Sequence, residues 1–301
     1  MTKPQDSFKI SLDRFENPVF VGGGSFGRVY KVRDKKTKKE YAAKVIRCDC
    51  NIEQYKMYIN REISILINFQ HPTIIKFYGY SLLDFEGQEN VTFLMQFSKK
   101  GSLAKLLENV KKGLADHNYN NTSRQIILVG IARGMMYLHQ HHIIHRDLKP
   151  DNILLDDNNY PLLIDFGLSK IPQFNLSTSS TKGCGTIIYL APESIIDNEY
   201  NEKSDVYSFG ILMYQIVTDC NPYPILETGE ITDFKFKKKV VEENFRPVFD
   251  SRLKIKDSIK NLIECCWNED PRKRPNFEEI FNYLAFSRKS YVIDIFNENS
   301  D

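Results

Sequence analysis

The stretch "HRDLKPDNILLDDNNYPLLIDFG", residues 145–167, places charged and amide side chains around two short apolar runs. Residues 153–155 and 162–164 resemble two strands joined by the turn-rich "DDNNYP", which predicts an antiparallel hairpin. Paired strands lie about 4.8 Å apart, so we expect Asn152 and Asp165, which flank them, to emerge side by side. Mg²⁺ prefers such carboxylate and amide oxygens together with phosphate and water. The stretch therefore predicts a metal site.

Asp147 and Lys149 precede Asn152 on the same connection, so a possible base, a cation and a metal ligand converge there. The alternative is a charged turn that only separates a helix from a hairpin. The order of the residues disfavours that alternative, because the His-Arg-Asp triplet at 145–147 directly follows an expected helix and the Asp-Phe-Gly triplet at 165–167 ends the hairpin.

A glycine-rich stretch lies near the start of the chain. "VGGGSFGRV", residues 21–29, sets Gly22, Gly24 and Gly27 ahead of Val29 between two expected strands. Glycine lets the backbone approach a polyphosphate closely, so that its N–H groups can face the oxygens. No Lys-Ser/Thr pair follows, which excludes a Walker A loop, and the strand after it disfavours a dinucleotide-binding fold. By itself the pattern also fits a glycine-rich hairpin turn.

Lys44 takes an inner position in the apolar strand "YAAKVI", residues 41–46. A buried ammonium needs an anionic partner. Glu62, on the helix expected over residues 55–69, could supply it by turning toward the sheet. Either residue alone would more often be a surface charge, but a lysine on the strand behind a glycine loop, followed by a helical glutamate, favours the paired interpretation.

Strand and helix patterns separate along the chain and predict an α+β fold. β-Branched and aromatic runs with turn residues between them dominate from about residue 15 to 97, with one main helix, and helical periodicity dominates after about residue 98. The strands are expected over 18–24, 27–33, 40–46, 74–80 and 91–97, and the later helices near 102–110, 122–141, 203–218, 232–243, 255–266 and 276–286.

Composition excludes several classes of protein. The 301 residues are 42% hydrophobic and 27% charged, which is ordinary for a globular chain. The net charge of +2 is too small for a nucleic-acid-binding footprint, so we expect no nucleic-acid partner. Six cysteines without a CxxC pair indicate reduced thiols. The longest apolar run, "IILVGIA", is far shorter than a membrane span and no signal segment is evident. We expect an intracellular, cytoplasmic location without a transmembrane segment.

Together these stretches resemble the eukaryotic protein kinase family. The glycine loop, "AAK", "HRDLKPDN", "DFG" and "APE" occur in that family's order. The resemblance covers residues 15–286 and implies a bilobal kinase fold, with a small β-rich N-lobe at about 15–97 and a larger helical C-lobe at about 98–286. Residues 1–14 and 287–301 would be short tails.

The resemblance implies a role for each residue of the two charged regions. Lys44 would hold the α- and β-phosphates of ATP and pair with Glu62, while Asp147 would accept the proton of the substrate hydroxyl. Lys149 would steady the γ-phosphate. The Mg²⁺ ligands implied are Asn152 and Asp165.

The same resemblance implies an adenine pocket. Met95 would be the gatekeeper behind the ring, and the hinge backbone at Gln96 and Ser98 would form hydrogen bonds with adenine. For each apolar residue of the pocket, core packing is an equally good interpretation. The side chains that would sandwich the ring are Val29, Ala42 and Leu154.

Structural roles follow from the resemblance as well. A stacked regulatory column is implied, anchored by Asp205 in "SDVYSFG", and Glu193 would form a buried ion pair with Arg274. The residues of the column would be Leu66, Phe77, His145 and Phe166.

Further sequence motifs indicate which amino acid of the substrate would accept the phosphate. Lys149 and the segment "CGTIIYLAPE", with Thr186, resemble Ser/Thr kinases, whereas "CCWNEDPRKRPNFEEI" resembles the tyrosine-kinase-like group, whose members mostly phosphorylate serine and threonine. We therefore expect protein substrates with Ser/Thr acceptors and keep dual specificity open. A catalytically inactive kinase-fold scaffold and a small-molecule kinase are competing hypotheses. The sequence indicates no oligomeric state.

Arg146 suggests control of signalling activity by phosphorylation, because an arginine before the catalytic acid can pair with a phosphate on the following segment and order it. Five hydroxyl residues lie at 177–181, and their spacing to Thr186 makes Ser180 and Thr181 the first candidates. An unmodified polar loop is the alternative.

Overall fold

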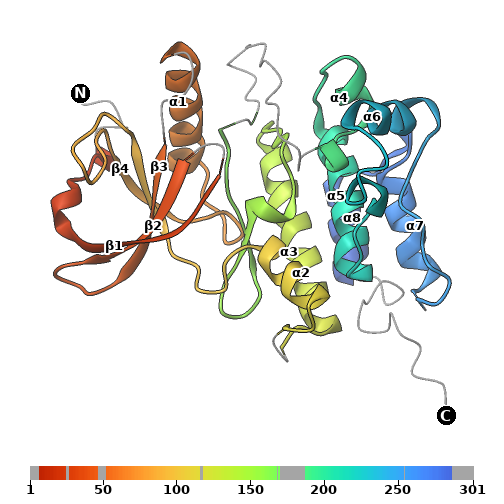
Figure 1. Cartoon of the computed structure of the whole chain (residues 1–301), viewed down its shortest axis with the longest axis horizontal. Helices are drawn as coiled ribbons and strands as arrows, with labels where there is room; N and C mark the ends of the chain where they lie inside the picture. The colour runs from red at the N-terminus through yellow and green to blue at the C-terminus, as the bar shows by residue number, and fades with distance from the viewer. Residues whose placement is uncertain are drawn as a thin grey trace. The chain divides into compact units, whose positions relative to one another are not determined.

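A five-stranded antiparallel sheet organises the first part of the chain, and helix α1 lies beside it (Figure 1). β-Branched and aromatic residues favour these strands. β4 starts later than the expected residue 74, because the N–H of Ile74 closes a turn with the His71 carbonyl at 3.0 Å. The elements are β1 (Phe15–Gly24), β2 (Gly27–Asp34), β3 (Glu40–Ile46), α1 (Ile52–Asn68), β4 (Phe77–Ser81) and β5 (Thr92–Gln96), with the strands in the spatial order β1-β2-β3-β5-β4.

The computed structural model describes residues 7–24, 27–46, 52–115, 118–167, 169, 187–253 and 255–286. The chain forms two compact units. The first comprises Met1–Lys99 together with Ile164–Leu168, and the second comprises Lys100–Leu163 and Ser169–Asp301. The α+β fold is confirmed, since the first unit carries the large sheet and the second carries most of the helices.

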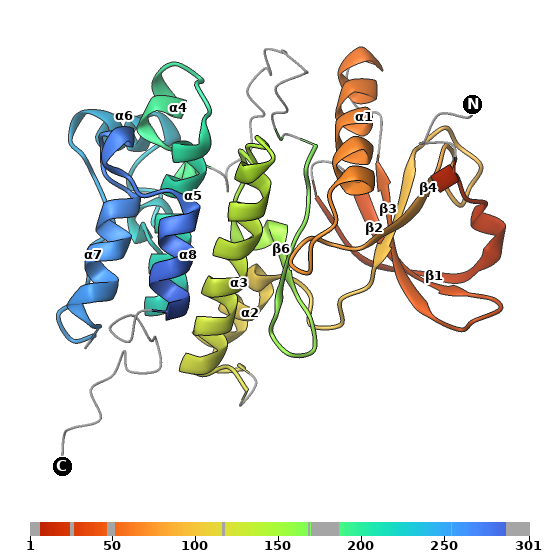
Figure 2. The same cartoon turned by 180° about the vertical axis from the view of Figure 1, so that it is seen from behind.

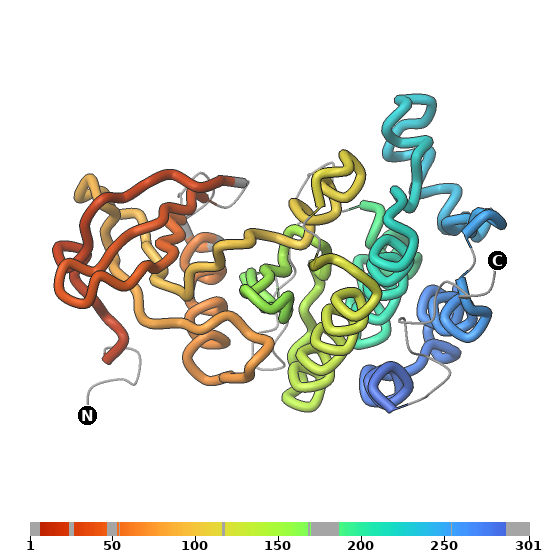
Figure 3. Tube along the Cα trace, turned by 90° about the horizontal axis from the view of Figure 1, so that it is seen from below, coloured from red at the N-terminus to blue at the C-terminus, as the bar shows by residue number. Residues whose placement is uncertain are grey.

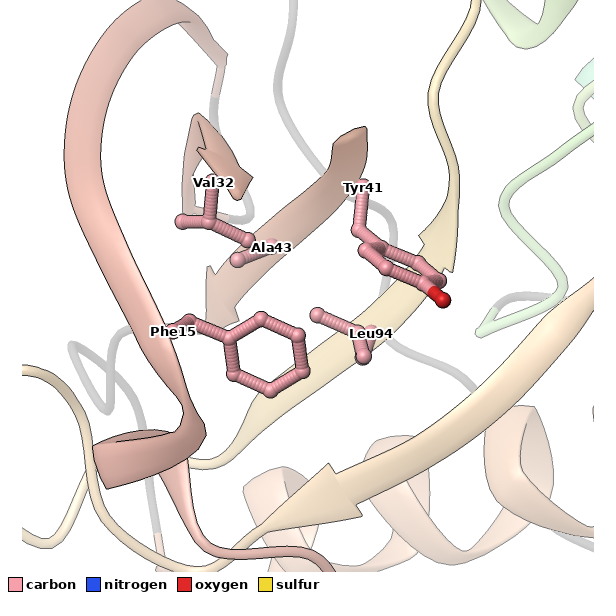
Figure 4. Packing of buried hydrophobic residues seen from close by; sticks show 5 residues of the cluster. All are labelled: Phe15, Val32, Tyr41, Ala43 and Leu94. Carbon is pink, nitrogen blue, oxygen red and sulfur yellow. The ribbon is translucent and has the colours of Figure 1, made fainter. Parts of the chain in front are cut away.

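An apolar cluster lies on one face of the large sheet (Figure 4). It consists of Phe15, Val32, Tyr41, Ala43 and Leu94. The Phe15 and Tyr41 rings meet edge to face with their centroids 5.7 Å apart. Side chains alternate across a strand, so Tyr41 and Ala43 point to this cluster while Lys44 points to the other face. β3 is therefore buried on both faces, which explains its nearly continuous apolar sequence.

The second unit is a set of packed helices with one small hairpin. α3 runs alongside α8 (Figure 2), and a view from below shows α3 beside α5 (Figure 3). Capping boxes begin α3 and α5, at Asn120 and Asn201. The helices are α2 (Leu103–Lys111), α3 (Asn121–Gln140), α4 (Pro192–Ile196), α5 (Glu202–Thr218), α6 (Asp233–Glu242), α7 (Asp257–Cys266) and α8 (Phe277–Phe286).

The predicted hairpin is present as β6 (Ile153–Leu155) and β7 (Pro161–Leu163). β7 begins one residue before the expected strand, because Pro161 pairs with Leu155 and Leu163 with Ile153. Helix α4 was not predicted, since five residues are too few to show a helical period. In the described part of the chain, no helix combines the length and the apolar character needed to cross a membrane.

A buried ion pair joins α4 to the segment before α8, as the family resemblance implied. Arg274 contacts the two carboxylate oxygens of Glu193 at 2.7 and 3.0 Å. Its guanidinium also donates to the carbonyls of Asn268 and Lys203, at 2.8 and 2.9 Å. The Arg274 side chain is fully buried, so its charge depends on these partners.

We expect Arg274→Ala to lower the free energy of unfolding by about 3–5 kcal/mol, because it leaves the Glu193 carboxylate uncompensated. Arg272→Ala is the matched control: Arg272 lies in the same segment but pairs with Asp270 from an exposed position, so its loss should cost much less. Urea denaturation of both variants checks the difference. Equal losses would contradict the structural role of the buried pair.

The turn between β2 and β3 is held together by the carboxylate of Asp34. The Asp34 carboxylate accepts hydrogen bonds from the N–H groups of Thr37 and Lys36, at 2.8 and 2.9 Å, and from Arg14. The hydrogen bond from Thr37, helped by Arg14 and Lys36 and opposed by burial, lowers the pKa of Asp34 from 3.8 to about 2. The ionised carboxylate therefore stabilises the fold above the unfolded-state pKa, and this stabilisation is lost as the pH falls toward 2.

Asp34→Asn keeps the shape of the side chain but cannot titrate. We expect the wild type to be the more stable protein near neutral pH, and its advantage over Asp34→Asn to shrink as the pH falls from about 5 to about 2. Chemical denaturation at several pH values measures this. An advantage that does not change with pH would rule out the proposed ionic role.

Candidate active site

Lys44 meets two carboxylates on the face of the sheet opposite the apolar cluster. Its Nζ lies 3.1 Å from Glu62 Oε1 and 3.4 Å from Asp165 Oδ1. The Lys44 side chain is 13% exposed and that of Glu62 only 2%. The predicted pairing of Lys44 with Glu62 is therefore confirmed, and Asp165 joins it as a third charged group.

Burial and charge act in opposite directions on this cluster. Burial would lower the pKa of Lys44, but the carboxylates of Asp165 and Glu62 outweigh it and raise that pKa above its usual value. Burial raises the pKa of Glu62 to about 7, against the effect of the Lys44 charge. The neighbouring carboxylates thus hold the Lys44 ammonium charged, whereas burial favours the protonated form of Glu62.

Two residues of α1 that the sequence pattern did not single out also reach this cluster. The Tyr58 hydroxyl donates to Asp165 Oδ1 at 2.7 Å, and Arg61 Nη1 donates to the Gly167 carbonyl at 3.2 Å. These contacts explain why Ile164–Leu168 belongs to the first unit. The signal that could have found Tyr58 is spacing, because it precedes Glu62 by four residues and so lies on the same helix face.

The glycine stretch forms the end of the β1–β2 hairpin, with Gly22 opposite Val29 and Gly24 opposite Gly27. Gly27 has a φ of 150°, and a Cβ there would lie 2.1 Å from the Val45 carbonyl oxygen. Only glycine fits this position. Residues 25 and 26 lie outside the described residues.

Strand register places several residues that are expected to bind the nucleotide on one face of the large sheet. Val29 lies opposite Lys44, and Met95 lies opposite Ala42. Directly opposed residues share a face, as do residues two apart on one strand, so these four side chains face the same way. Leu154 belongs to the second unit, where it pairs with Leu162.

The hinge residues lie at the end of β5. The Gln96 N–H donates to the Lys76 carbonyl at 2.9 Å, so the Gln96 carbonyl is the group that could meet adenine. Ser98 follows β5 and is half-buried. The adenine-binding roles of both residues stay predictions.

In the second unit, Asp147 is the centre of a buried polar cluster. Lys149 Nζ lies 2.8 Å from Asp147 Oδ2, and Asn152 Nδ2 donates to the same oxygen and to the Asp147 carbonyl, both at 2.8 Å. Within the part of the chain that the structure describes, Asp147 Oδ1 has no hydrogen-bond partner. One carboxylate oxygen is thus fixed by neighbours, and the second can accept a proton.

The donor set fits a hard cation. Because the Asn152 amide nitrogen is committed to Asp147, the amide oxygen is the atom that would face a metal. That oxygen and the Asp165 carboxylate are the kind of ligand that Mg²⁺ takes. The two residues belong to different units, so their juxtaposition stays a prediction.

Asp205, on α5, holds the chain just before Asp147. Its carboxylate accepts hydrogen bonds from the backbone N–H groups of His145 and Arg146, both at 2.8 Å, and lies 2.9 Å from His139 Nε2. The expected anchor thus contacts the backbone at His145. Four residues of the expected column are buried, and their stacking stays a prediction: Leu66, Phe77, His145 and Phe166.

Arg146 has a φ of 69°, and its guanidinium lies 5.0 Å from the centroid of the Tyr200 ring. This cation–π contact joins the half-buried arginine to the chain that follows α4. The expected phosphorylation sites Ser180 and Thr181, and Thr186, lie outside the described residues.

Several known proteins are similar in sequence to this chain over most of its length. A family model described as "Protein kinase domain" matches residues 15–286. The serine/threonine-protein kinase CTR1 of Arabidopsis thaliana is 32% identical over 278 residues, which cover 90% of this chain and 31% of CTR1. The dual specificity protein kinase zakA of Dictyostelium discoideum is 33% identical over 294 residues, covering 91% of this chain and 35% of zakA.

A further Dictyostelium discoideum protein, described as a probable serine/threonine-protein kinase, is 33% identical over 274 residues, 88% of this chain and 19% of that protein. This chain thus spans about a fifth to a third of the length of these relatives. The match to the kinase domain includes residues of both units, among them Lys44, Glu62, Asp147 and Asp165. The chain therefore belongs to the protein kinase family.

Proposed function

We propose that this chain transfers the γ-phosphate of ATP to serine and threonine hydroxyls of protein substrates. The observation that carries the proposal is the Asp147 carboxylate, with Oδ2 held by Lys149 and Asn152 and Oδ1 buried without a partner among the described residues. A base held in this way is oriented before the substrate arrives, which lowers the barrier to proton transfer.

In the proposed reaction, Asp147 Oδ1 accepts the proton of the substrate hydroxyl as the oxygen attacks the γ-phosphorus. The bond between the γ-phosphorus and the β–γ bridging oxygen breaks, and ADP leaves. Lys149 neutralises negative charge near the transferred group, and Lys44 binds the α- and β-phosphates. Mg²⁺, held by Asn152 and Asp165, would supply further charge neutralisation at the phosphate oxygens.

Nucleotide binding is proposed to use residues of both units. The shared face of Val29, Ala42 and Met95 in the sheet supports an apolar surface for adenine, and Gly27 supports a close backbone approach to phosphate. Kinases of this family use ATP and Mg²⁺ in this way. Leu154 would complete the adenine surface.

The names of the relatives and the residues near Asp147 support serine and threonine as the phosphate acceptors. CTR1 is named a serine/threonine-protein kinase, and Lys149 resembles the lysine of Ser/Thr kinases. Dual specificity is the second candidate, because zakA carries that name. A catalytically inactive scaffold is disfavoured, since Lys44, Asp147 and Asp165 are all present.

We expect purified protein with Mg²⁺ and labelled ATP to phosphorylate a mixture of generic protein substrates on serine and threonine. Asp147→Asn should lower the rate by about 10²–10⁴-fold, because it removes the base. Asp157→Asn is the control, since Asp157 is an exposed residue of the β6–β7 turn and should leave the rate unchanged.

Identification of the labelled amino acids separates the candidates. Label on tyrosine as well as serine and threonine would favour dual specificity. If the folded wild type binds ATP but transfers no phosphate, the scaffold is the better interpretation, and a rate that survives Asp147→Asn would remove Asp147 as the base.

Regulation by phosphorylation of the segment before Glu193 is part of this proposal. The position of Arg146 next to Asp147 supports it, because a phosphate there could pair with the guanidinium. Mass spectrometry of active protein is expected to find phosphate at Ser180 or Thr181, and phosphatase treatment to lower the rate. Active protein without phosphate in residues 177–181 would contradict this.

A further inference from the structure

Tyr58 is a half-buried tyrosine whose hydroxyl contacts the charged cluster of the first unit. Its hydroxyl donates to Asp165 Oδ1 at 2.7 Å and accepts from Lys44 Nζ at 3.4 Å. Glu62, one helical turn later, contacts the same Lys44 ammonium. One hydroxyl thus links the lysine proposed to bind phosphate with the aspartate proposed to bind Mg²⁺.

The position of the Tyr58 ring is set by Gly167. A Cβ on Gly167 would lie 1.8 Å from the ring, so the ring occupies space that only a glycine leaves open. The carbonyl of Gly167 accepts a hydrogen bond from Arg61 Nη1 at 3.2 Å. Helix α1 therefore holds residues 165–167 at two points, through Tyr58 and through Arg61.

The backbone of Asp165 has an unfavourable conformation that contacts from α1 can stabilise. Its φ of 66° is in the left-handed region, which is uncommon for a residue other than glycine. Conformations of this kind persist where surrounding contacts determine them, and they concentrate at functional sites. Tyr58 and Lys44 both bind Oδ1, which orients the carboxylate as well as the backbone that carries it.

We propose that Tyr58 is a positioning residue for phosphoryl transfer, which orients the Asp165 carboxylate for Mg²⁺ by donating a hydrogen bond to Oδ1. The proposal rests on the proposed function of Asp165 as a metal ligand. Carboxylates that ligate metals are commonly oriented by hydrogen bonds, and removing such a bond typically costs about 10–100-fold in metal affinity or activity. The opposite effect, in which the hydroxyl competes with the metal, is an outcome of the test.

The test compares Tyr58→Phe with Tyr55→Phe. Each substitution removes one hydrogen-bonded hydroxyl from the same helix, but the Tyr55 hydroxyl binds the backbone, donating to the Ile46 carbonyl at 3.2 Å and accepting from the Val91 N–H at 3.0 Å. Loss of helix attachment alone would affect both variants. Loss of carboxylate orientation would affect Tyr58→Phe alone.

The measurement is ATP binding by isothermal titration calorimetry across a range of Mg²⁺ concentrations, with thermal unfolding recorded for each variant. We expect the Mg²⁺ concentration for half-maximal enhancement of ATP affinity to rise about 10–100-fold in Tyr58→Phe and to stay at the wild-type value in Tyr55→Phe. An unchanged Mg²⁺ requirement in Tyr58→Phe would overturn the proposal, and so would a lower one, which would show competition between hydroxyl and metal.

If Tyr58→Phe does not fold, Gly167→Ala provides the same test, because its methyl group displaces the Tyr58 ring. It should raise the Mg²⁺ requirement, and no rise would overturn the proposal. Calorimetry measures binding without turnover. If the wild type binds ATP with Mg²⁺ but transfers no phosphate, the proposed function is wrong, and the comparison of Tyr58→Phe with Tyr55→Phe still tests the positioning role of Tyr58. If Mg²⁺ has no effect on ATP binding by the wild type, both the proposed function and the proposed role of Tyr58 are wrong.

Discussion

A largely buried ammonium group on the middle strand of a sheet is the constraint on which the first unit depends. A charge removed from water is costly unless carboxylates and hydrogen bonds surround it. Lys44 obtains them from two places, Glu62 on α1 and Asp165 far along the chain. Lys44 thus helps to hold α1 on that face of the sheet, and together with the contacts of Tyr58 and Arg61 it ties Ile164–Leu168 to this unit.

Two buried aspartates of the second unit show how the same functional group serves structure and chemistry. Asp205 accepts two backbone N–H groups and contacts His139, which fixes the chain before Asp147. Asp147 is held through Oδ2 alone, and Oδ1 has no partner among the described residues. A satisfied carboxylate stabilises a loop, whereas an incompletely satisfied one retains the capacity to take a proton.

Two residues of the candidate active site, one in each unit, have a strained backbone conformation. Arg146 and Asp165 both have left-handed φ values, of 69° and 66°. Each is held by groups from elsewhere in its own unit: Asp205 binds the N–H of Arg146, and Tyr58 binds the side chain of Asp165. The unfavourable conformations therefore depend on packing that forms only when the unit folds.

Local pattern was sufficient for most of the elements and for the chemical character of the site. The apolar residues around Lys44 in β3 indicated its inner position, helical spacing placed Glu62 on α1, and turn residues marked the β6–β7 hairpin, because each of these signals depends on a few neighbouring residues. Pattern could not show α4, which is shorter than two helical turns, or the start of β4, which a turn at His71 delays.

Beyond the expected ion pairs of Lys44 with Glu62 and of Glu193 with Arg274, only the tertiary structure decided which groups meet. The contacts of Tyr58 with Asp165, of Arg61 with Gly167, and of Asp205 with the backbone of Arg146 join residues that are distant in sequence. No periodicity reports such pairs, because they arise when burial forces each polar group to find whichever partner the packed chain brings within hydrogen-bond distance.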